Sequence, residues 1–520
     1  MHTAPEMPTT NDGHPQRWWI LATVSLIIFI LSADNTILNV AIPTLGRELN
    51  ASASDVKWFI EGYILVFCGL MLTGGALADR FGARTMIVTG LTIFGAMTLL
   101  AAIASSSATL IVGRAGIGFG AAMMFPATLS VLKQIFSDAE RPKAIAVWTA
   151  IAVLGALIGP ILGGVILGSF AWGVLFSYKL PIVLIAGVMT WMLIPKLPTC
   201  VVPLDLLGSL LSVLGVSSLV FTIIEGPKWG FDSALFWVSA LVSLALMVGF
   251  VVWEQRTTHP MLDVTLFKNP SFSAASISVV LAYFALSGLS FNLTQYLQYV
   301  NGHSPLQAAL RTLPMAAAAL VGSVAAAPII SGIGTRWTIV GGLLVTAASF
   351  FLYATLGPSS GDLIIIVAGI LLGIGAGAAG TASFTSVLES VSADKAGSAS
   401  AVNETGIEFG NALGLAVLGT ILSGSFTQTL LASPAAKTLQ PKEADSILSV
   451  LNAAERLGGQ TGAALARAAR VSFSNAMDLT ALIGAAVVLL GAFIAWRCLR
   501  TVQPLPVDEA RVGHSNRKTP

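Results

Sequence analysis

The composition of this 520-residue chain indicates a protein that lies in lipid rather than in water. Hydrophobic residues make up 55% of it and charged residues only 10%, whereas soluble domains average about 25% charged residues. A net charge of +2 without a long basic run excludes a nucleic-acid-binding surface. The widely spaced Cys68, Cys200 and Cys498 suit neither a disulfide framework nor a CxxC metal site.

Fourteen stretches are long and apolar enough to cross a bilayer as helices, because a hydrocarbon core of about 30 Å needs roughly 20 residues. They cover residues 18–43, 56–78, 85–104, 108–132, 144–168, 173–195, 204–225, 233–253, 272–299, 306–331, 337–357, 362–390, 397–424 and 473–497. The first runs well past the length of a signal-peptide core, so we expect an uncleaved span.

Basic residues in short loops predict the orientation, because such residues prefer the cytoplasmic side. With the N-terminus inside, that side holds Arg80, Arg84, Lys133, Arg141, Lys143, Arg256, Lys268, Arg336, Arg497 and Arg500. An even number of spans then places both termini in the cytoplasm. The loop at 425–471 carries basic residues on the opposite side, and its Ala/Leu spacing predicts a short external helical hairpin.

The two halves of the chain resemble each other. Motifs recur in the same order: Phe29–Ser32 as Phe284–Ser287, Gly116–Ala122 as Gly373–Ala379, and Gly155/Gly159 as Gly410/Gly414. Such internal repeats are typical of transporters. We predict an all-α integral membrane protein with six-helix bundles at 18–197 and 272–497, two inserted helices at 204–253, an external loop at 425–471, and cytoplasmic tails at 1–17 and 498–520.

An acid stands in the first span, within the stretch Asp34–Pro43. A carboxylate near the middle of a membrane costs on the order of 2.5–3.5 kcal/mol on insertion scales. Low-dielectric surroundings favour its neutral form, which suits a site that takes up and releases protons. The alternative is an Asp34 that stabilises the helices by a hydrogen bond to a neighbouring span.

The second span and the loop after it carry further polar residues. Glu61 of the second span is a further acid in an apolar segment, and Trp58 lies one turn before it. The following loop contains Gly75, Asp79, Arg80, Gly82 and Arg84, in which the glycines permit a tight turn and the charges hold the loop at the membrane face.

In the fourth span, Arg114 lies inside an apolar helix and needs an acidic or carbonyl partner, for which Asp34 is the first candidate and backbone carbonyls the alternative. The fifth span contains Gly155, Gly159, Pro160, Gly163 and Gly164. These glycines let neighbouring helices approach closely, and the proline permits a kink.

The thirteenth span carries Glu404, Glu408 and Asn411 on one helical face. Exposing two glutamates to lipid would cost free energy, so this face is not expected to point at lipid. We expect them to line a wet cavity, or alternatively to act in gating or in hydrogen bonds between helices. Aromatic residues able to stack on a flat cation are Trp58, Tyr63, Phe67, Trp148, Phe284, Phe291 and Tyr296, although most membrane aromatics serve packing.

Together these motifs resemble the major facilitator superfamily, and within it the fourteen-span drug:proton antiporter branch. The loop at 75–84 is similar to the family's G-x-L-A-D-R-x-G-R/K signature, and Gly155–Gly164 to its antiporter motif. The stretch at Asp34–Pro43, the arginine of the fourth span and the Asn403–Gly414 stretch resemble elements of the branch, although Ile117 replaces the family's glutamine.

The resemblance implies a monomer in a bacterial inner membrane that exports lipophilic cations, such as quaternary ammonium compounds and dyes, in exchange for protons. Asp34 would carry the proton with Arg114 as its modulator, while Glu61, Glu404, Glu408 and the aromatics Trp58, Tyr63, Phe284, Phe291 and Tyr296 would recognise the cation. We expect no metal, no cofactor, no nucleic-acid partner and no enzymatic activity. The alternatives are a dedicated exporter of a metabolite, peptide, siderophore or antibiotic, and a receptor that has lost transport.

Overall fold

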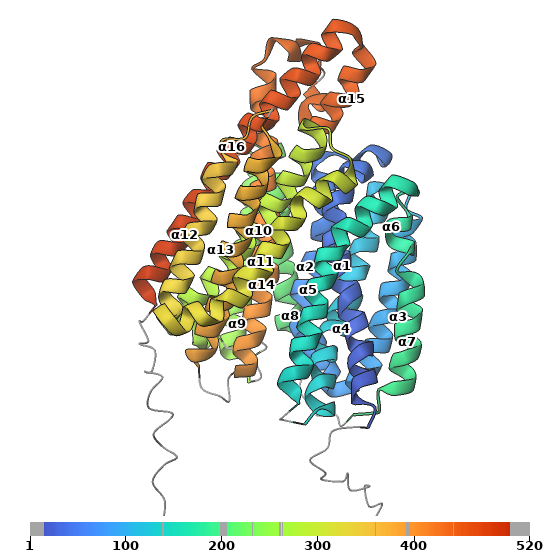
Figure 1. The fold of residues 1–520 in the computed structure, drawn as a ribbon, viewed down its shortest axis with the longest axis vertical. Helices are drawn as coiled ribbons and strands as arrows, with labels where there is room; N and C mark the ends of the chain where they lie inside the picture. The colour runs from blue at the N-terminus through green and yellow to red at the C-terminus, as the bar shows by residue number, and fades with distance from the viewer. Residues whose placement is uncertain are drawn as a thin grey trace, which may run out of the picture.

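The computed structural model describes residues 15–137, 140–197, 205–230, 232–258, 260, 262, 264–358, 360–391, 396–439 and 441–499. Cys200 and most of the two predicted tails lie outside these ranges. The described residues contain helices and no strands (Figure 1), which confirms the predicted all-helical fold. Thirteen helices are long and apolar enough to cross a membrane, and a bent helix pair makes a fourteenth candidate span.

The first half of the chain forms a bundle of helices. They are α1 (Arg17–Glu48), α2 (Ala53–Phe81), α3 (Ala83–Ala102), α4 (Ser107–Ile135), α5 (Arg141–Ser169), α6 (Val174–Ser177) and α7 (Leu180–Leu193). The bent span is α2, whose axis turns by 54° between Met71 and Thr73. The last span is broken between α6 and α7, where Pro181 lies in the first turn of α7.

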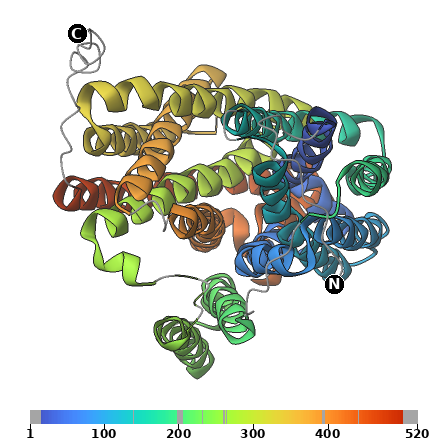
Figure 2. The same ribbon diagram turned by 90° about the horizontal axis from the view of Figure 1, so that it is seen from below.

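The inserted helices α8 (Leu206–Trp229) and α9 (Ala234–Arg256) lie together outside the two bundles (Figure 2). Helix α8 packs against α2 and α14. Polar contacts fasten α8 to α2 at both ends: Glu225 accepts hydrogen bonds from Ser54 and from Trp58 Nε1, and the hydroxyls of Thr73 and Ser209 are 2.6 Å apart.

The second half forms the other bundle. Its helices are α10 (Pro270–Gln295, continued by a π-helical turn at Tyr296–Val300), α11 (Pro305–Ile333), α12 (Thr335–Tyr353), α13 (Asp362–Glu389), α14 (Ala396–Leu431), α15 (Ile447–Leu457) and α16 (Gly459–Cys498). Within the loop predicted at 425–471, α14 continues to Leu431 and α16 already begins at Gly459, so helix occupies both ends of this segment. Between them, 3-10 helices and α15 cover one end of the molecule, which we term the capped end (Figure 1).

The bundles meet along two seams, where α2 packs against α14 and α5 against α11. Each half has its own apolar core. The core of the first half also takes in Phe291 of α10 together with Ala412, Leu415 and Ala416 of α14. The halves are therefore in apolar contact at the α2–α14 seam.

The internal repeat is visible in the packing of equivalent helix pairs. In the first half, a Cβ at Gly155 of α5 would lie 2.6 Å from the carbonyl oxygen of Phe29 on α1. In the second half, a Cβ at Gly414 of α14 would overlap the carbonyl oxygen of Phe284 on α10 even more closely. In the predicted repeat, Gly155 corresponds to Gly410 and not to Gly414. The contact in the second half is therefore displaced by one helical turn along α14 relative to the contact in the first half.

We expect Gly155→Val to force α1 and α5 apart, because the added atoms would overlap the backbone of α1. Overpacking of this kind typically costs about 1–3 kcal/mol, and it is measured as a lower unfolding temperature of the purified protein in detergent. Gly168→Val, in the same helix, is the matched control, because a Cβ there has no neighbour within 4 Å. Equal unfolding temperatures for the two variants would contradict the proposed contribution of this contact.

Candidate functional site

Asp34 of α1 lies in a buried cluster of three charged side chains. Its Oδ2 accepts a hydrogen bond of 2.6 Å from Arg114 of α4, and its Oδ1 accepts one from Nζ of Lys179, which precedes α7. All three side chains are 0% exposed. The predicted pairing of Arg114 with Asp34 is therefore present, and a second cation joins it.

Arg114 is also held by α2. Its Nε donates to the backbone carbonyl oxygen of Phe59 at 2.9 Å, and its guanidinium carbon lies 4.6 Å from the ring centre of Tyr63. Arg114 therefore donates both to the acid and to a backbone carbonyl, the two kinds of partner that the sequence suggested as alternatives. These contacts fix the guanidinium between α1, α2 and α4.

Sequence reasoning missed Lys179. It lies within the span predicted at 173–195 but belongs to none of the motifs considered. The available signal was its charge, because a lysine inside an apolar segment is rare and needs a partner. The break between α6 and α7 places Lys179 at the cap of α7, from which its side chain reaches Asp34.

Glu61 of α2 is fully buried, and neither of its carboxylate oxygens has a hydrogen-bond partner among the described residues. Lys57, one turn earlier on α2, lies within electrostatic range of it and donates to Thr420 of α14 at 3.0 Å. An ionised carboxylate without partners is costly to bury. Glu61 is therefore a place where a proton or a bound cation lowers the free energy.

Glu404 and Glu408 of α14 are partly exposed and lie within electrostatic range of each other. Across the seam, Cys68 of α2 lies within electrostatic range of both Glu61 and Glu408, and its thiol approaches the Thr405 carbonyl oxygen at 3.8 Å. Acids from the two halves thus converge on the α2–α14 seam.

Tyr63 connects this seam to the buried charge cluster. It lies within electrostatic range of Asp34, Arg114 and Glu408, and its ring stacks on that of Phe67 with centroids 5.6 Å apart. Tyr63 therefore lies between Asp34 and Glu408, Glu404 neighbours Glu408, and Cys68 lies between Glu408 and Glu61, so the four acids form a chain of neighbours.

The aromatic residues expected to recognise a cation do not share one environment. Phe284 and Phe291 are buried in α10 beside the seam. Trp58 instead donates to Glu225 and lies against Phe221 of α8, so it faces the inserted helices. Tyr296 donates to the carbonyl oxygen of Gly357 at 2.6 Å within the second half. The polar atoms of Trp58 and Tyr296 thus bind other partners, and the role of these residues in cation recognition stays a prediction.

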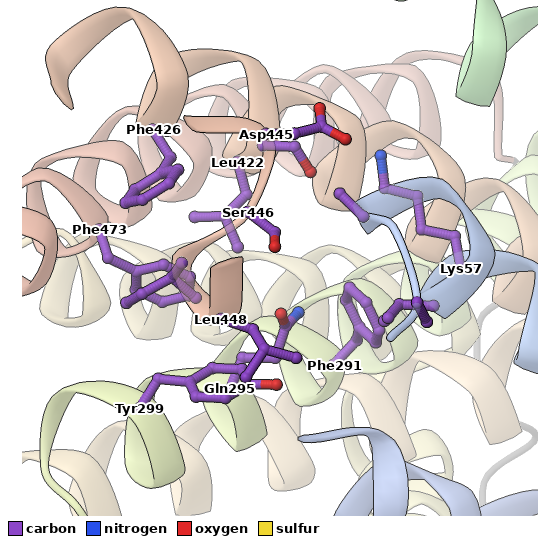
Figure 3. Close-up of a pocket in the computed structure, with 15 residues that line it drawn as sticks. Lys57, Phe291, Gln295, Tyr299, Leu422, Phe426, Asp445, Ser446, Leu448 and Phe473 are labelled. Carbon is purple, nitrogen blue, oxygen red and sulfur yellow. The ribbon is translucent and has the colours of Figure 1, made fainter. Parts of the chain in front are cut away.

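A cavity lies beneath the capped end where the two halves meet (Figure 3). Lys57 points into it from α2, with Phe291 and Gln295 of α10 on one wall. The rest of its lining includes Tyr299, Leu422, Phe426, Asp445, Ser446, Leu448 and Phe473. Asp34, Glu61, Glu404 and Glu408 are not among the residues that line this cavity.

The loop motif at 75–84 forms the junction of α2 and α3 at the opposite end of the molecule. Asp79 and Arg80 are exposed there, and Gly82 has a φ of 88°, a conformation that favours glycine. Arg84 donates to the Trp191 carbonyl oxygen at 2.5 Å. In the second half, Gly334 joins α11 to α12 with a φ of 83°, so the repeat keeps the turn glycine although it lacks the acid.

The antiporter-type motif places α5 between two partners. Gly159 and Gly163 face Ala33 and Ile37 of α1, whereas a Cβ at Gly164 would lie 2.5 Å from the Cα of Leu306 on α11. Small residues let both neighbours approach closely. The motif therefore packs within the first half and across the α5–α11 seam at the same time.

A model of the Major Facilitator Superfamily matches residues 24–415. The chain is 32% identical over 496 residues to the multidrug efflux pump LfrA of Mycolicibacterium smegmatis, covering 94% of this chain and 97% of that protein. It is 30% identical over 494 residues to the methyl viologen resistance protein SmvA of Salmonella typhimurium, covering 94% and 99%. The tetracenomycin C resistance and export protein of Streptomyces glaucescens is 28% identical over 493 residues, with 93% and 91% covered.

Among solved structures, an inward-facing, unoccupied bacterial homologue of the human lysosomal transporter Spinster matches with a TM-score of 0.66. The match covers 94% of this chain and 99% of that one at 19% identity, so it shows the fold.

Proposed function

This chain is a member of the major facilitator superfamily and thus a membrane-embedded transporter rather than an enzyme, and we propose that it exports lipophilic cationic drugs in exchange for protons. Its relatives include multidrug, methyl viologen and antibiotic resistance pumps, which supports drug export. We place it in a bacterial plasma membrane as a monomer, with both termini in the cytoplasm and the capped end outside.

The observation that supports this proposal is the convergence of a fully buried acid of the first half and a partly exposed acid of the second half on one seam. Glu61 comes from α2 and Glu408 from α14, and Cys68 lies within electrostatic range of both. A carboxylate in such surroundings is neutralised by a proton or by a cation, but a single site does not hold both. Competition between proton and drug for the same acids couples their fluxes.

The two bundles would rock about these acids, exposing them first to the cytoplasm and then to the outside, as in other transporters built from repeats. Drug entering from the cytoplasm displaces a proton, and external protons displace the drug. Asp34 with Arg114 would carry protons, and Glu61, Glu404 and Glu408 would hold the cation. The loop at 75–84 and the glycines of α5 would adjust during the rocking motion.

The energetics set the expected stoichiometry. One pH unit across the membrane supplies about 1.4 kcal/mol per proton, and 100 mV supplies about 2.3 kcal/mol per net charge moved. A monocation exchanged for one proton moves no net charge and uses the pH gradient alone. A dication requires two protons for the same balance, and the seam offers several acids for them.

Purified protein in liposomes tests the proposal. When the compartment at the capped end is one pH unit more acidic, ethidium is expected to accumulate there up to about tenfold, the limit for one-to-one exchange. Nigericin, which collapses the pH gradient, is expected to abolish the accumulation. Ethidium that binds but is not moved by the gradient would contradict transport and favour a receptor.

A dedicated exporter of one antibiotic or metabolite is the second candidate. The observation in its favour is the similarity to the tetracenomycin C resistance and export protein, which spans 93% of this chain. Competition in the same liposomes separates the two candidates. Inhibition of ethidium flux by chemically unrelated cations supports a multidrug pump, whereas a lack of inhibition favours a dedicated exporter.

A further inference from the structure

The buried charge cluster of α1, α4 and α7 contains one acid and two bases. Asp34 accepts hydrogen bonds from both Arg114 and Lys179, and all three side chains are 0% exposed. With every group ionised the cluster carries one surplus positive charge. A buried surplus charge is expensive, so the group that can shed it determines how the cluster responds to pH and to an approaching cation.

Arg114 is not that group. A guanidinium stays protonated in proteins, and this one is fixed by the Phe59 carbonyl oxygen and the Tyr63 ring as well as by Asp34. Arg114 and Asp34 therefore form a balanced pair that is anchored to α2. The surplus charge resides on Lys179.

The surroundings of Lys179 supply few other means of balancing its charge. Asp34, already shared with Arg114, is its only hydrogen-bond partner within the described ranges. The rings of Phe176, Phe94 and Tyr178 lie with their centres 5.2, 5.8 and 6.0 Å from Nζ, and they offer weaker stabilisation than a carboxylate. Lys179 also precedes the N-terminus of α7, whose partial positive charge opposes an ammonium group.

We propose that the proton-exchanging unit is the Asp34–Lys179 pair, in which the Lys179 ammonium gives up its proton when a cation binds at the seam and regains it when the cation leaves. This inference rests on the proposed proton-coupled export, and within it the exchanged proton is assigned to Lys179 in place of Asp34, which stays ionised. In the step, one N–H bond of Lys179 breaks, the amine keeps the electron pair, and the proton passes to water. The cluster changes from one positive charge to none, while Arg114 keeps Asp34 ionised.

The geometry links this exchange to the substrate. Tyr63, against which Arg114 packs, lies within electrostatic range of both Asp34 and Glu408. A cation held at Glu408 therefore adds a positive charge near a cluster that already has one in excess. Lys179 is a positioning residue for transport, because it acts through the charge of the cluster and not through contact with the drug.

Two substitutions separate this role from a structural one. Lys179→Arg keeps the positive charge permanently, and Lys179→Met removes it. Ethidium binding is measured by fluorescence anisotropy in detergent from acidic to alkaline pH, together with the protons released into a weakly buffered solution. Lys268, exposed at the surface, supplies the matched control substitutions Lys268→Arg and Lys268→Met.

We expect the Arg variant to bind ethidium as the parent does at acidic pH but on the order of tenfold more weakly at alkaline pH, because it keeps a unit charge that the parent loses there. The Met variant is expected to match the parent at alkaline pH and to bind about tenfold more tightly at acidic pH. Both variants are expected to release fewer protons on binding ethidium, because neither side chain can give up the proton that Lys179 releases. The Lys268 variants keep the parent profile.

An Arg variant with the parent pH profile, beside a Met variant that no longer binds ethidium, would overturn the inference and show a structural lysine. If Lys179→Met does not insert stably, Lys179→Gln, which keeps an N–H donor without the charge, takes its place in the same comparison. A parent protein whose ethidium binding releases no protons would instead overturn the proposed antiport itself.

Discussion

Asp34→Asn is expected to abolish pH-driven ethidium accumulation in liposomes and to lower the stability of the protein. Within the described ranges, the substitution removes the only carboxylate in contact with Arg114 and Lys179, and it leaves two buried cations near each other. Breaking a buried ion pair in this way typically costs about 3–5 kcal/mol. The flux is measured per inserted protein, and the stability as the unfolding temperature in detergent.

The double variant Asp34→Asn with Lys179→Met separates the two effects. It restores the original net charge of the cluster, so we expect it to recover much of the lost stability without recovering transport. Asp34→Glu keeps the charge and controls for the shape of the site. Ethidium pumping by Asp34→Asn at the rate of the parent would remove Asp34 from the coupling mechanism.

Glu408→Gln is expected to impair the export of dications far more than that of monocations. Removing one exchangeable acid leaves one fewer proton to balance the drug, so a dication exchanged for one proton carries a net positive charge outward. Against a membrane potential of 100 mV, this charge costs about 2.3 kcal/mol, or about fiftyfold in accumulation. A monocation still exchanges for one proton without moving net charge.

The measurement compares methyl viologen, a dication, with ethidium in liposomes at a clamped potential. Glu61→Gln is expected to give the same pattern, because Glu61 is buried without a hydrogen-bond partner in the described part of the chain. Glu48→Gln, exposed at the end of α1, is the control. A loss of equal size for both cations would show that these acids hold the drug without setting the number of protons.

The sequence predicted those parts of the fold that depend on local composition. Apolar length identified the spans, and repeated glycines identified α5 and α14 as helices with close neighbours, because close helix contacts require small residues wherever they occur. The structure identifies these neighbours as α1 and α10. The Asp34–Arg114 contact was also predictable, since a charge inside an apolar helix needs a partner of opposite sign.

Contacts that depend on the direction of a side chain were not predictable in the same way. Trp58 and Glu61 are close together on α2, yet the indole binds Glu225 of an inserted helix while the acid stays buried near the seam. Lys179 was overlooked because its role arises from the break between α6 and α7, which follows no motif. Likewise, apolar length did not show how far α14 and α16 extend, since both helices continue into the segment predicted as a loop.

Because α8 is attached to α2, the two contact lines between the bundles differ in how far they are exposed to the bilayer. One contact line between the bundles, α2–α14, is screened from lipid by α8, while no inserted helix in the described ranges covers the other, α5–α11 (Figure 2). A lipophilic molecule that diffuses in the membrane plane therefore meets the inserted helices on one flank and the bundles themselves on the other. Entry from the lipid at the α2–α14 contact requires α8 to move, whereas at the α5–α11 contact it requires only the two bundles to separate.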